Sequence, residues 1–574
     1  MSHADSTSAA HDRRAFLGYF SALGLGGTLL PGVLWARAAA GEEITEETVA
    51  CAAEVAGLEF DEAERKLMVE GLRQQRRRIE GLRGIYLANS VPPALVFDPV
   101  LPEMEVPAGA DRARGGVTVS RAPAVRVPER LDELAFLPVT ALSELVRTRK
   151  VTPTQLTRMY LDRLRRYDPV LRAVVTLTEE RALRQAEELD REVARGRRRG
   201  PLHGIPWGAK DLLAVRGYPT TWGAAPFREQ AIDEDATVVR RLDEAGAVLV
   251  AKLSLGALAQ GDVWFGGTTR NPWKTDQGSS GSSAGPGSAT AAGLVGFAIG
   301  SETLGSISSP ATRNGVTGLR PTFGRVPRTG AMALSWTMDK LGPMCRSVED
   351  CALVFDAVRG PDGADPTVRA APFRFDARTR PADLRIGYFR AAFERDEKEY
   401  PNRPFDQAAL EVLRAQGATL LPVDVPEAGY DAMRLILVAE AAAAFDELTR
   451  SGRDDELTGQ GPGDWPNTFR TARLIPAVEY INANRVRTLA MRAWARLFEQ
   501  VDVVVAPTFG TQQLVATNLT GHPAVILPSG FREDGTPVSI TFLGGLFEEG
   551  KLLAVANAYQ CATDFHLRRP AAFV

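Results

Sequence analysis

The chain has 574 residues, with 68 lysines and arginines against 71 aspartates and glutamates, so its formal net charge is −3. Such a balanced charge gives no electrostatic footprint for nucleic acid, and we expect no nucleic-acid partner. Hydrophobic residues make up 44% and charged residues 24%, which excludes a disordered or fibrous chain. The four cysteines are too few for a disulfide framework, and the five histidines form no metal-binding motif. We therefore expect neither a metal nor a cofactor.

The amino terminus has the pattern of an export signal. Arg13 and Arg14 precede an uncharged stretch over residues 18–35, and a small-residue run follows over residues 36–40. A basic region, an apolar region and an A-x-A-like site make up such a signal, and paired arginines are typical of the twin-arginine class. Residues 1–40 are therefore predicted to be a twin-arginine-type export signal, which places the mature protein in the periplasm or outside the cell. The alternative is a retained membrane anchor.

Residues 41–128 are predicted to be a helical extension followed by a linker. Asp61 and Glu64 have the form of a capping box, and apolar residues then recur at helical spacing up to Leu82. Prolines and glycines gather between residues 90 and 128, where we place a domain boundary.

From residue 129 onward the pattern becomes α/β. Thr152 and Gln155 predict a helix start with a proline at its first position, and an amphipathic helix is expected near residues 235–245. Short β-rich runs alternate with such helices, which implies a sheet covered by helices. The strand candidates are Ala173–Leu177, Ala247–Ala251, Leu384–Tyr388, Val501–Ala506, Ala524–Leu527 and Val538–Phe542.

A glycine- and serine-rich run over residues 278–287 stands apart from the rest of the chain. It leads directly into an alanine-rich segment, which is typical of a buried helix and argues against a flexible linker. No lysine closes the run as a phosphate loop requires, and Thr290 replaces the third glycine of a dinucleotide fingerprint. Gly281–Gly285 does fit G-x-S-x-G, so an α/β-hydrolase-like esterase with Ser283 as nucleophile stays open, although no hydrophobic strand precedes it.

Two segments together resemble the amidase signature family. One runs from Ser282 to Ser306, and the other, Leu202–Asp211, contains Gly-Ile-Pro shortly before Lys210. The family's core pattern is a glycine-serine run, an alanine-rich helix and Thr-Gly-Gly-Ser-Ile, with a lysine upstream. The two serines are 24 residues apart (306 − 282), which is the family's spacing, and the lysine lies 72 residues before the first serine (282 − 210). Segments 318–325 and 341–344 also match, and the resemblance covers about residues 142–570.

The resemblance implies an amidase signature catalytic domain over residues 129–574, an α/β fold with a single large mixed β-sheet covered on both faces by helices. It also implies a Ser-Ser-Lys triad, with Ser306 as the nucleophile, Ser282 as a bridging serine after a cis peptide bond, and Lys210 as the base. The implied oxyanion hole consists of the main-chain N–H groups of Thr303, Leu304, Gly305 and Ser306. An exposed ammonium, with a pKa of about 10.4, cannot accept a proton at neutral pH, so we expect Lys210 to be buried.

The chain departs from the family pattern at two positions. Leu304 stands where the family has a glycine, and Ser308 stands where an arginine commonly follows Ser-Ile. Both changes favour a neutral or apolar acyl group over one with a recognised carboxylate. Ser283, Trp207 and His522 are candidate substrate contacts.

The predicted function is an exported amidase that hydrolyses a carboxylic amide through an acyl-enzyme, with esters and carbamates as further substrates of the family. One alternative is an amidotransferase-type glutaminase subunit that works with a partner protein; the export signal argues against it, because charged tRNA stays in the cytoplasm. Another is a non-catalytic exported binding protein. We expect a small-molecule amide substrate and no stable membrane span in the mature chain, and a homodimer is left open.

Overall fold

The computed structural model describes residues 43–85, 116–120 and 125–574. The described residues divide into two compact units: unit 1 consists of residues 43–85, Asp431–Asp455 and Gly459–Val486, and unit 2 consists of residues 116–120 and 125–430, Glu456–Thr458 and Arg487–Val574. The helices predicted in the extension therefore share a unit with two segments that fall within the predicted catalytic domain. The predicted export signal and most of the predicted linker lie outside the described residues.

Unit 1 is helical. The capping box at the start of its longest amino-terminal helix is confirmed, because Asp61 N donates to Glu64 Oε2 at 2.7 Å and Glu64 N donates to Asp61 Oδ1 at 2.8 Å. The apolar stripe of that helix is buried, and Arg470 pairs with Glu64 at 2.7 Å. Its main helices are α3 (Glu46–Ala56), α4 (Glu62–Arg83), α15 (Leu435–Ala444), α16 (Asp446–Arg450) and α17 (Trp465–Ala472). α4 packs on α17, and α15 packs on α17.

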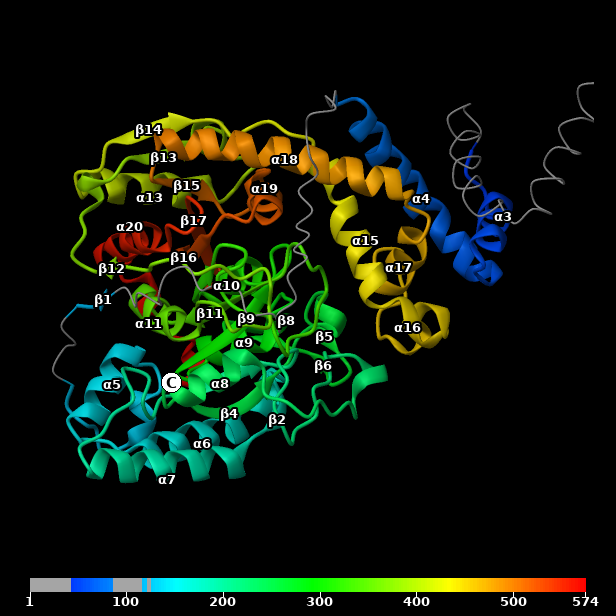
Figure 1. Cartoon of the computed structure of the whole chain (residues 1–574). Helices are drawn as coiled ribbons and strands as arrows, with labels where there is room; N and C mark the ends of the chain where they lie inside the picture. The colour runs from blue at the N-terminus through cyan, green and yellow to red at the C-terminus, as the bar shows by residue number, and fades with distance from the viewer. Residues whose placement is uncertain (1–42, 86–115, 121–124) are drawn as a thin grey trace, which may run out of the picture. The chain divides into compact units, whose positions relative to one another are not determined.

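Unit 2 is built on an eleven-stranded mixed sheet, which confirms the predicted α/β fold (Figure 1). In spatial order its strands are β14 (Leu420–Val423), β13 (Ile386–Phe389), β15 (Val503–Pro507), β17 (Pro537–Gly544), β16 (Ala524–Phe531), β10 (Thr317–Arg320), β11 (Lys340–Cys345), β9 (Phe297–Glu302), β3 (Pro206–Lys210), β4 (Val248–Leu253) and β2 (Val174–Leu177). All six strand candidates from the sequence lie in this sheet. Three two-stranded sheets accompany it: β1 (Val117–Thr118) with β12 (Phe375–Asp376), β5 (Val263–Trp264) with β6 (Gly267–Thr268), and β7 (Arg270–Asn271) with β8 (Lys274–Gly278).

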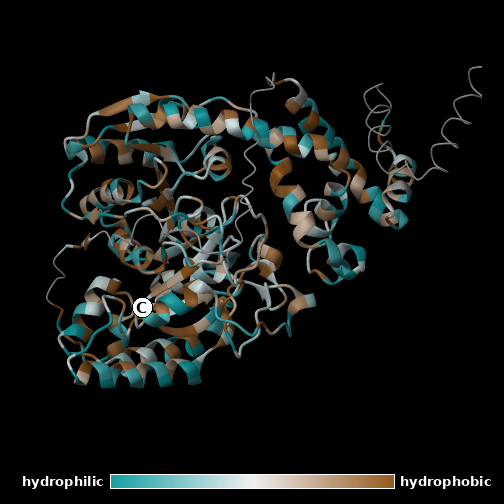
Figure 2. Cartoon of the chain, viewed as in Figure 1, coloured by the Kyte–Doolittle hydropathy of each residue, from teal (hydrophilic) through white to brown (hydrophobic). Residues whose placement is uncertain are grey.

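Helices flank the large sheet. α9 and α10 contact each other and the strands β9 and β10, whereas α11 and α20 contact each other and the strands β10 and β16. Figure 2 shows the matching pattern of hydropathy, with hydrophobic residues along β4 and many hydrophilic ones along α7. The helices are α5 (Val139–Arg147), α6 (Pro153–Leu171), α7 (Glu179–Ala194), α8 (Thr237–Glu244), α9 (Ala284–Ala291), α10 (Ser308–Asn314), α11 (Val348–Val358), α12 (Arg390–Phe393), α13 (Arg403–Ala415), α19 (Gln513–Thr520) and α20 (Glu549–Ala562). α14 (Tyr430–Met433) and α18 (Ala477–Gln500) contribute residues to both units.

The register of three parallel strands brings the predicted lysine and the segment that contains Ser306 together at the carboxyl ends of these strands. β3 pairs in parallel with β4 on one side and with β9 on the other. Ala209 is opposite Ile299, so the next residue of β3, Lys210, lies beside the end of β9. Carboxyl ends of parallel strands are where α/β sheets place their functional residues.

A buried ion pair joins β4 to the residue that follows β3. Lys252 Nζ lies 2.6 Å from Asp211 Oδ1, and neither side chain is exposed to solvent. Thr221 donates its N–H and its hydroxyl to the other carboxylate oxygen. This pair fixes the segment directly after Lys210.

We expect Asp211→Asn to lower the free energy of unfolding by about 3–5 kcal/mol, because it leaves the buried Lys252 charge without its partner. Asp233→Asn is the matched control: Asp233 pairs with Arg216 at 3.2 Å, but its side chain is 96% exposed. Removal of that exposed pair should cost less than about 1 kcal/mol. Urea denaturation of the three proteins measures both changes. An Asp211→Asn effect no larger than that of Asp233→Asn would contradict the role assigned to the buried pair.

Candidate active site

Lys210 lies at the centre of a cluster of three serine hydroxyls. Its Nζ is 2.8 Å from Ser282 Oγ, 3.1 Å from Ser283 Oγ and 2.8 Å from Ser301 Oγ. The side chain is fully buried, as expected from the sequence. The peptide bond between Gly281 and Ser282 is cis, in agreement with the expectation for the bridging serine.

The hydrogen bonds of these hydroxyls leave two of them, Ser282 and Ser301, as possible proton donors to the amine. Ser283 Oγ donates to the carbonyl oxygen of Ser301 and accepts the Ser301 N–H, both at 3.1 Å, so it is committed to the backbone. A neutral amine has two N–H donors and one lone pair, so one of the three hydroxyls must donate to it. Within the described residues, neither Ser282 Oγ nor Ser301 Oγ has a hydrogen-bond partner other than Lys210, and of the two only Ser282 lies next in the chain to the residue that contacts the 303–306 turn. Ser282 can therefore turn its proton toward the amine.

Burial sets the protonation of Lys210. Desolvation holds the pKa of its amine well below the ordinary value, although the charges of Asp339 and Glu302 oppose this shift. A depressed pKa makes the neutral amine available at neutral pH, which is the form a general base needs.

A buried carboxylate shapes the turn that carries Ser306. Glu302 ends β9, and its Oε2 accepts the N–H of Ile307 at 2.9 Å and the N–H of Ser308 at 2.8 Å. Its Oε1 accepts from Arg320 and from Asn518, both at 2.8 Å. Although burial raises the pKa of Glu302, the Arg320 charge and these hydrogen bonds lower it to about 2. The carboxylate thus stays ionised and ties both ends of the turn together.

The turn over residues 303–306 presents main-chain N–H groups at the site. Gly305 has a φ of 88°, a conformation that glycine adopts without strain. Among the described residues, no protein acceptor receives the N–H groups of Leu304, Gly305 and Ser306. Ser283 N donates to the carbonyl oxygen of Ser306 at 3.1 Å, so the turn lies next to the residue that follows Ser282. Ser306 itself is half-buried.

We expect Glu302→Gln to lower kcat by about 10- to 100-fold with a smaller change in KM, because the turn holding the reacting serine loses its fixed position. The side-chain amide of the glutamine would also place its own N–H donor next to N–H groups that now donate to the Glu302 carboxylate, and those hydrogen bonds would be lost. Steady-state kinetics on a small amide substrate measures the change.

Glu549→Gln is the matched control for that substitution. Glu549 is also fully buried and pairs with Arg325 at 3.3 Å, so the loss of stability should be similar. It has no contact with the 303–306 turn among the hydrogen bonds and ion pairs of the described residues, so kcat should change little. Equal kcat losses in the two variants would show that Glu302 acts through stability alone.

Two of the candidate substrate contacts lie in the core. Trp207 is fully buried and stacks on Phe297 at 6.0 Å between ring centroids. Because it lies three residues before Lys210 in the same strand, it faces the opposite side of the sheet. His522 is also buried, between the rings of Trp494 and Phe498, and desolvation lowers its pKa to about 3.

Ser283 is buried as well, and its contacts do not fit an esterase nucleophile. Its partners are Lys210 and the backbone of Ser301, and no histidine of the described chain is among them. The strand that precedes the run, β8, is polar and belongs to a small hairpin sheet rather than to the large one.

Three residues that complete this arrangement are not predicted from the sequence: Ser301, Glu302 and Arg320. One signal was present, because Glu302 is the only acidic residue between Asp276 and Asp339, and it follows an apolar segment. A lone acidic residue in such a stretch indicates a buried carboxylate with a specific partner. Ser301 has no comparable signal of its own, whereas Arg320 lies in segment 318–325, which matches the family pattern but does not by itself indicate a partner for this arginine.

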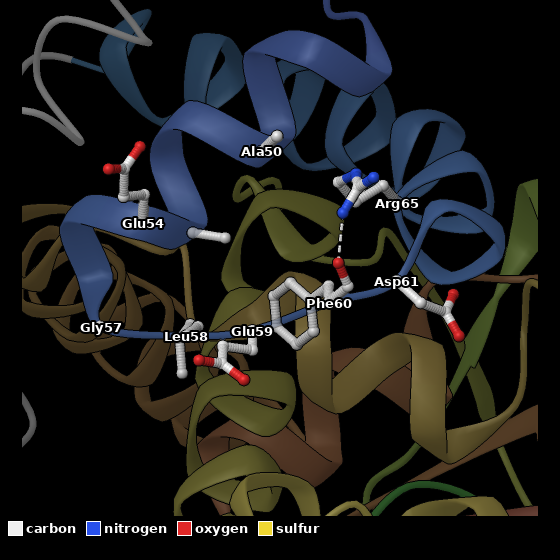
Figure 3. Close-up of a pocket in the computed structure, with 9 residues that line it drawn as sticks. Ala50, Glu54, Gly57, Leu58, Glu59, Phe60, Asp61 and Arg65 are labelled. Atoms are coloured by element: carbon white, nitrogen blue, oxygen red, sulfur yellow. Dashed lines mark hydrogen bonds between the residues drawn. The ribbon is translucent and has the colours of Figure 1, made fainter.

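A pocket in unit 1 is lined by none of the residues of the Lys210 site. Its volume is about 670 Å³, and it lies between α3 and α4 (Figure 3). Glu54, Glu59 and Asp61 line it, and Arg65 donates to the carbonyl oxygen of Phe60. It offers neither a nucleophile nor a buried base. Separately, none of the helices in the described part of the chain is long and apolar enough to span a membrane.

Comparisons with known proteins show the family of this chain. The Amidase family model matches residues 155–514. The A subunit of glutamyl-tRNA(Gln) amidotransferase from Chloroflexus aggregans is 34% identical over 485 residues, which cover 77% of this chain and 99% of that protein. Its counterpart from Moorella thermoacetica is 33% identical over 488 residues, with 76% and 99% covered.

Solved structures show the same fold. Native peptide amidase from Stenotrophomonas maltophilia superimposes with a TM-score of 0.66 at 32% identity, covering 75% of this chain and 97% of that one. The 6-aminohexanoate cyclic dimer hydrolase has a TM-score of 0.67, with 77% and 100% covered, and at 23% identity it supports the fold alone.

These relatives overturn one prediction. The chain was expected outside the cytoplasm, but the relatives that match over most of its length are named as subunits of a tRNA-dependent amidotransferase. Charged tRNA stays in the cytoplasm, so the predicted periplasmic or extracellular location is wrong. The arginine pair behind that prediction lies outside the described residues. The family model, the curated relatives and the solved structures agree on two points. This chain belongs to the amidase signature family, and it is an enzyme of the amide hydrolase type.

Proposed function

We propose that the protein cleaves a carboxylic amide with Ser306 as nucleophile, Ser282 as proton relay and Lys210 as base. The observation that carries this proposal is the 2.8 Å contact between Lys210 Nζ and Ser282 Oγ in a fully buried setting. A base and a hydroxyl in hydrogen-bond reach, next to a second serine on a turn with available N–H groups, meet the requirements for acyl transfer.

The proton moves along this chain of groups in both halves of the reaction. The neutral Lys210 accepts the proton of Ser282, which takes that of Ser306 as the latter attacks the amide carbonyl. The negative charge that develops on the carbonyl oxygen is stabilised by the main-chain N–H groups of Thr303, Leu304, Gly305 and Ser306. The proton then returns through Ser282 to the leaving amine, and water, activated by the same pair, hydrolyses the acyl-enzyme.

Covalent labelling tests the nucleophile directly. We expect a fluorophosphonate probe to add one label per chain, carried by Ser306. Ser283 and Ser306 lie in one tryptic peptide, residues 275–313, so fragment ions must locate the label. A label on Ser283 would contradict the proposal and support the esterase alternative.

A second function, that of an amidotransferase-type glutaminase subunit working with a partner protein, is favoured by the names of the curated relatives. Those relatives are subunits of glutamyl-tRNA(Gln) amidotransferases, at 34% and 33% identity. These names support the second function better than a hydrolase that acts alone. The departures at Leu304 and Ser308 point the other way, because they favour an acyl group without a recognised carboxylate.

Ammonia release separates the two functions. A hydrolase that acts alone should release ammonia from neutral peptide amides without any other protein, and should do so faster than from glutamine. An amidotransferase-type subunit should show little activity by itself and should gain activity on glutamine when the partner proteins of such an amidotransferase are added. Activity on glutamine only in the presence of those partners would contradict the hydrolase that acts alone.

A further inference from the structure

A small pocket lies where three parallel strands of the large sheet end. β14, β13 and β15 are neighbours and run in parallel, at the edge of the sheet shown in Figure 1. The pocket has a volume of about 240 Å³, and its walls include Phe389 and Val423, the last residues of β13 and β14, and Gly510, shortly after β15. The carboxyl ends of parallel strands form a crevice in which α/β proteins bind ligands. None of the residues 210, 282 and 306 lines it.

The pocket contains an arginine whose charge has no ion-pair partner among the described residues. Arg395 Nε donates to the carbonyl oxygen of Ala392 at 3.0 Å, and Nη1 donates to that of Gly510 at 2.9 Å. Its Nη2 is buried without a hydrogen-bond partner, and no carboxylate of the described residues forms an ion pair with this guanidinium. Because the positive charge of Arg395 has no ion-pair partner among the described residues and the side chain lines the pocket, the guanidinium is suited to an anionic ligand.

The backbone around Arg395 holds the guanidinium in place. Gly510 has a φ of 82°, and a Cβ there would lie 2.2 Å from Arg395 Nη1. The missing side chain therefore leaves the space that the guanidinium occupies. The ring of Tyr400 lies 3.7 Å from the guanidinium carbon and covers one of its faces. Two hydrogen bonds and a stacked ring leave Arg395 little freedom, which favours a specific site.

The pocket also carries a negative charge that does not neutralise the arginine. Asp424 lines it, is exposed, and makes no ion pair with Arg395. The remaining walls are mostly apolar: Phe389, Ala391, Ala392, Val423 and Val425. One cation and one anion that stay apart over an apolar floor are complementary to a small zwitterion, more than to a simple anion.

We propose that this pocket binds a free α-amino acid with a small apolar side chain, with its carboxylate on Arg395, its ammonium on Asp424 and its side chain against the apolar walls. The volume is below the roughly 300–1,000 Å³ of sites for drug-sized ligands, which agrees with so small a ligand. This binding site is separate from the serines and the lysine, so it does not depend on the proposed amide hydrolysis.

Calorimetric titration with three matched probes tests the proposal on the full chain. The probes are L-leucine, 4-methylpentanoate, which lacks its amine, and isoamylamine, which lacks its carboxylate. We expect leucine to bind at least about tenfold more tightly than either of the others, since each lacks one charged contact. Arg395→Gln should lower the affinity for leucine by about tenfold or more. Asp424→Asn should lower the affinity for leucine to that of 4-methylpentanoate. Because Asp424 is exposed, the second variant keeps the test independent of any folding defect in the first.

Controls locate the site. Arg390→Gln removes an exposed arginine of the neighbouring α12 and should leave leucine binding unchanged. Arg395→Gln and Asp424→Asn should both keep the amide hydrolysis of the wild type. No heat from leucine up to about 10 mM would overturn the proposal. Equal affinity for leucine and 4-methylpentanoate would reduce the pocket to an anion site and overturn the amino-acid assignment, as would unchanged leucine binding in Arg395→Gln.

Discussion

Ser306→Ala should lower kcat by at least about 10⁴-fold, because it removes the atom that forms the acyl-enzyme. The folded structure should be unaffected, since the residue is half-buried and its backbone, rather than its hydroxyl, holds the turn: Ser283 N donates to its carbonyl oxygen at 3.1 Å. Residual activity would come from the main-chain N–H groups and from substrate binding, which the substitution leaves in place. Steady-state rates on a peptide amide measure the loss, and circular dichroism checks the fold.

Ser309→Ala is the control for that substitution. Ser309 lies in α10, one turn further along the chain, and its hydroxyl pairs with that of Ser280 at 2.8 Å. The same atom is deleted close by, so a general disturbance of this helix would lower the rate in both variants. We expect the kcat of the Ser309 variant to stay within about tenfold of the wild-type value. A loss of that size results from a small displacement of the reacting groups, whereas the loss of the nucleophile lowers kcat far more. Full activity of Ser306→Ala would move the nucleophile to another residue.

The sequence predicted the outer strands of the sheet better than its centre. The six runs recognised as strands are rich in valine, isoleucine and alanine, and all of them pair in the sheet. β3, β9, β10 and β11 form most of the centre, yet they contain glycine, proline, lysine and serine: Pro206–Lys210 reads PWGAK and Lys340–Cys345 reads KLGPMC. These residues lower β propensity, and local patterns therefore do not predict the strands. At Gly208 and Gly342 a Cβ would lie 2.4 Å from the Leu253 side chain and 2.0 Å from the Leu319 carbonyl oxygen, so packing between neighbouring strands requires glycine there, which is tertiary information.

The sequence indicates the candidate reacting residues of the site, but it does not indicate the residues that hold them in position. The spacing of Ser282, Ser306 and Lys210 is visible in one dimension because each lies in a recognisable motif. Glu302 is supported by Arg320, 18 residues away, and by Asn518, 216 residues away. Contacts at such separations depend on strand order, and no local pattern shows which strands become neighbours. The face of β3 on which Trp207 lies likewise depends on where the sheet is covered, so the sequence alone does not show whether this ring points toward the site.

Lys210→Met should abolish turnover and also change how stability depends on pH. The base is lost, so kcat should fall by at least about 10⁴-fold, as for other members of a catalytic unit. In the folded wild type, burial lowers the pKa of Lys210 well below the ordinary value, so the amine is neutral at every pH above that lowered pKa. In the unfolded chain the same amine is protonated up to a pH of about 10. The unfolded state therefore binds one more proton in this window, and stability should rise with pH.

The size of that rise follows from linkage. One extra proton bound by the unfolded state raises the free energy of unfolding by about 1.4 kcal/mol per pH unit, from above the folded pKa to below the unfolded one. This contribution is absent from Lys210→Met, so the difference in stability between wild type and variant should grow in favour of the wild type as pH rises from 7 to 9. Lys340→Met is the control, because Lys340 is also buried and its pKa is also held well below the ordinary value by desolvation. It should show the same change in slope while keeping activity within about tenfold. If Lys210→Met had the same pH dependence of stability as the wild type, the amine would be charged in the folded enzyme and could not act as the base.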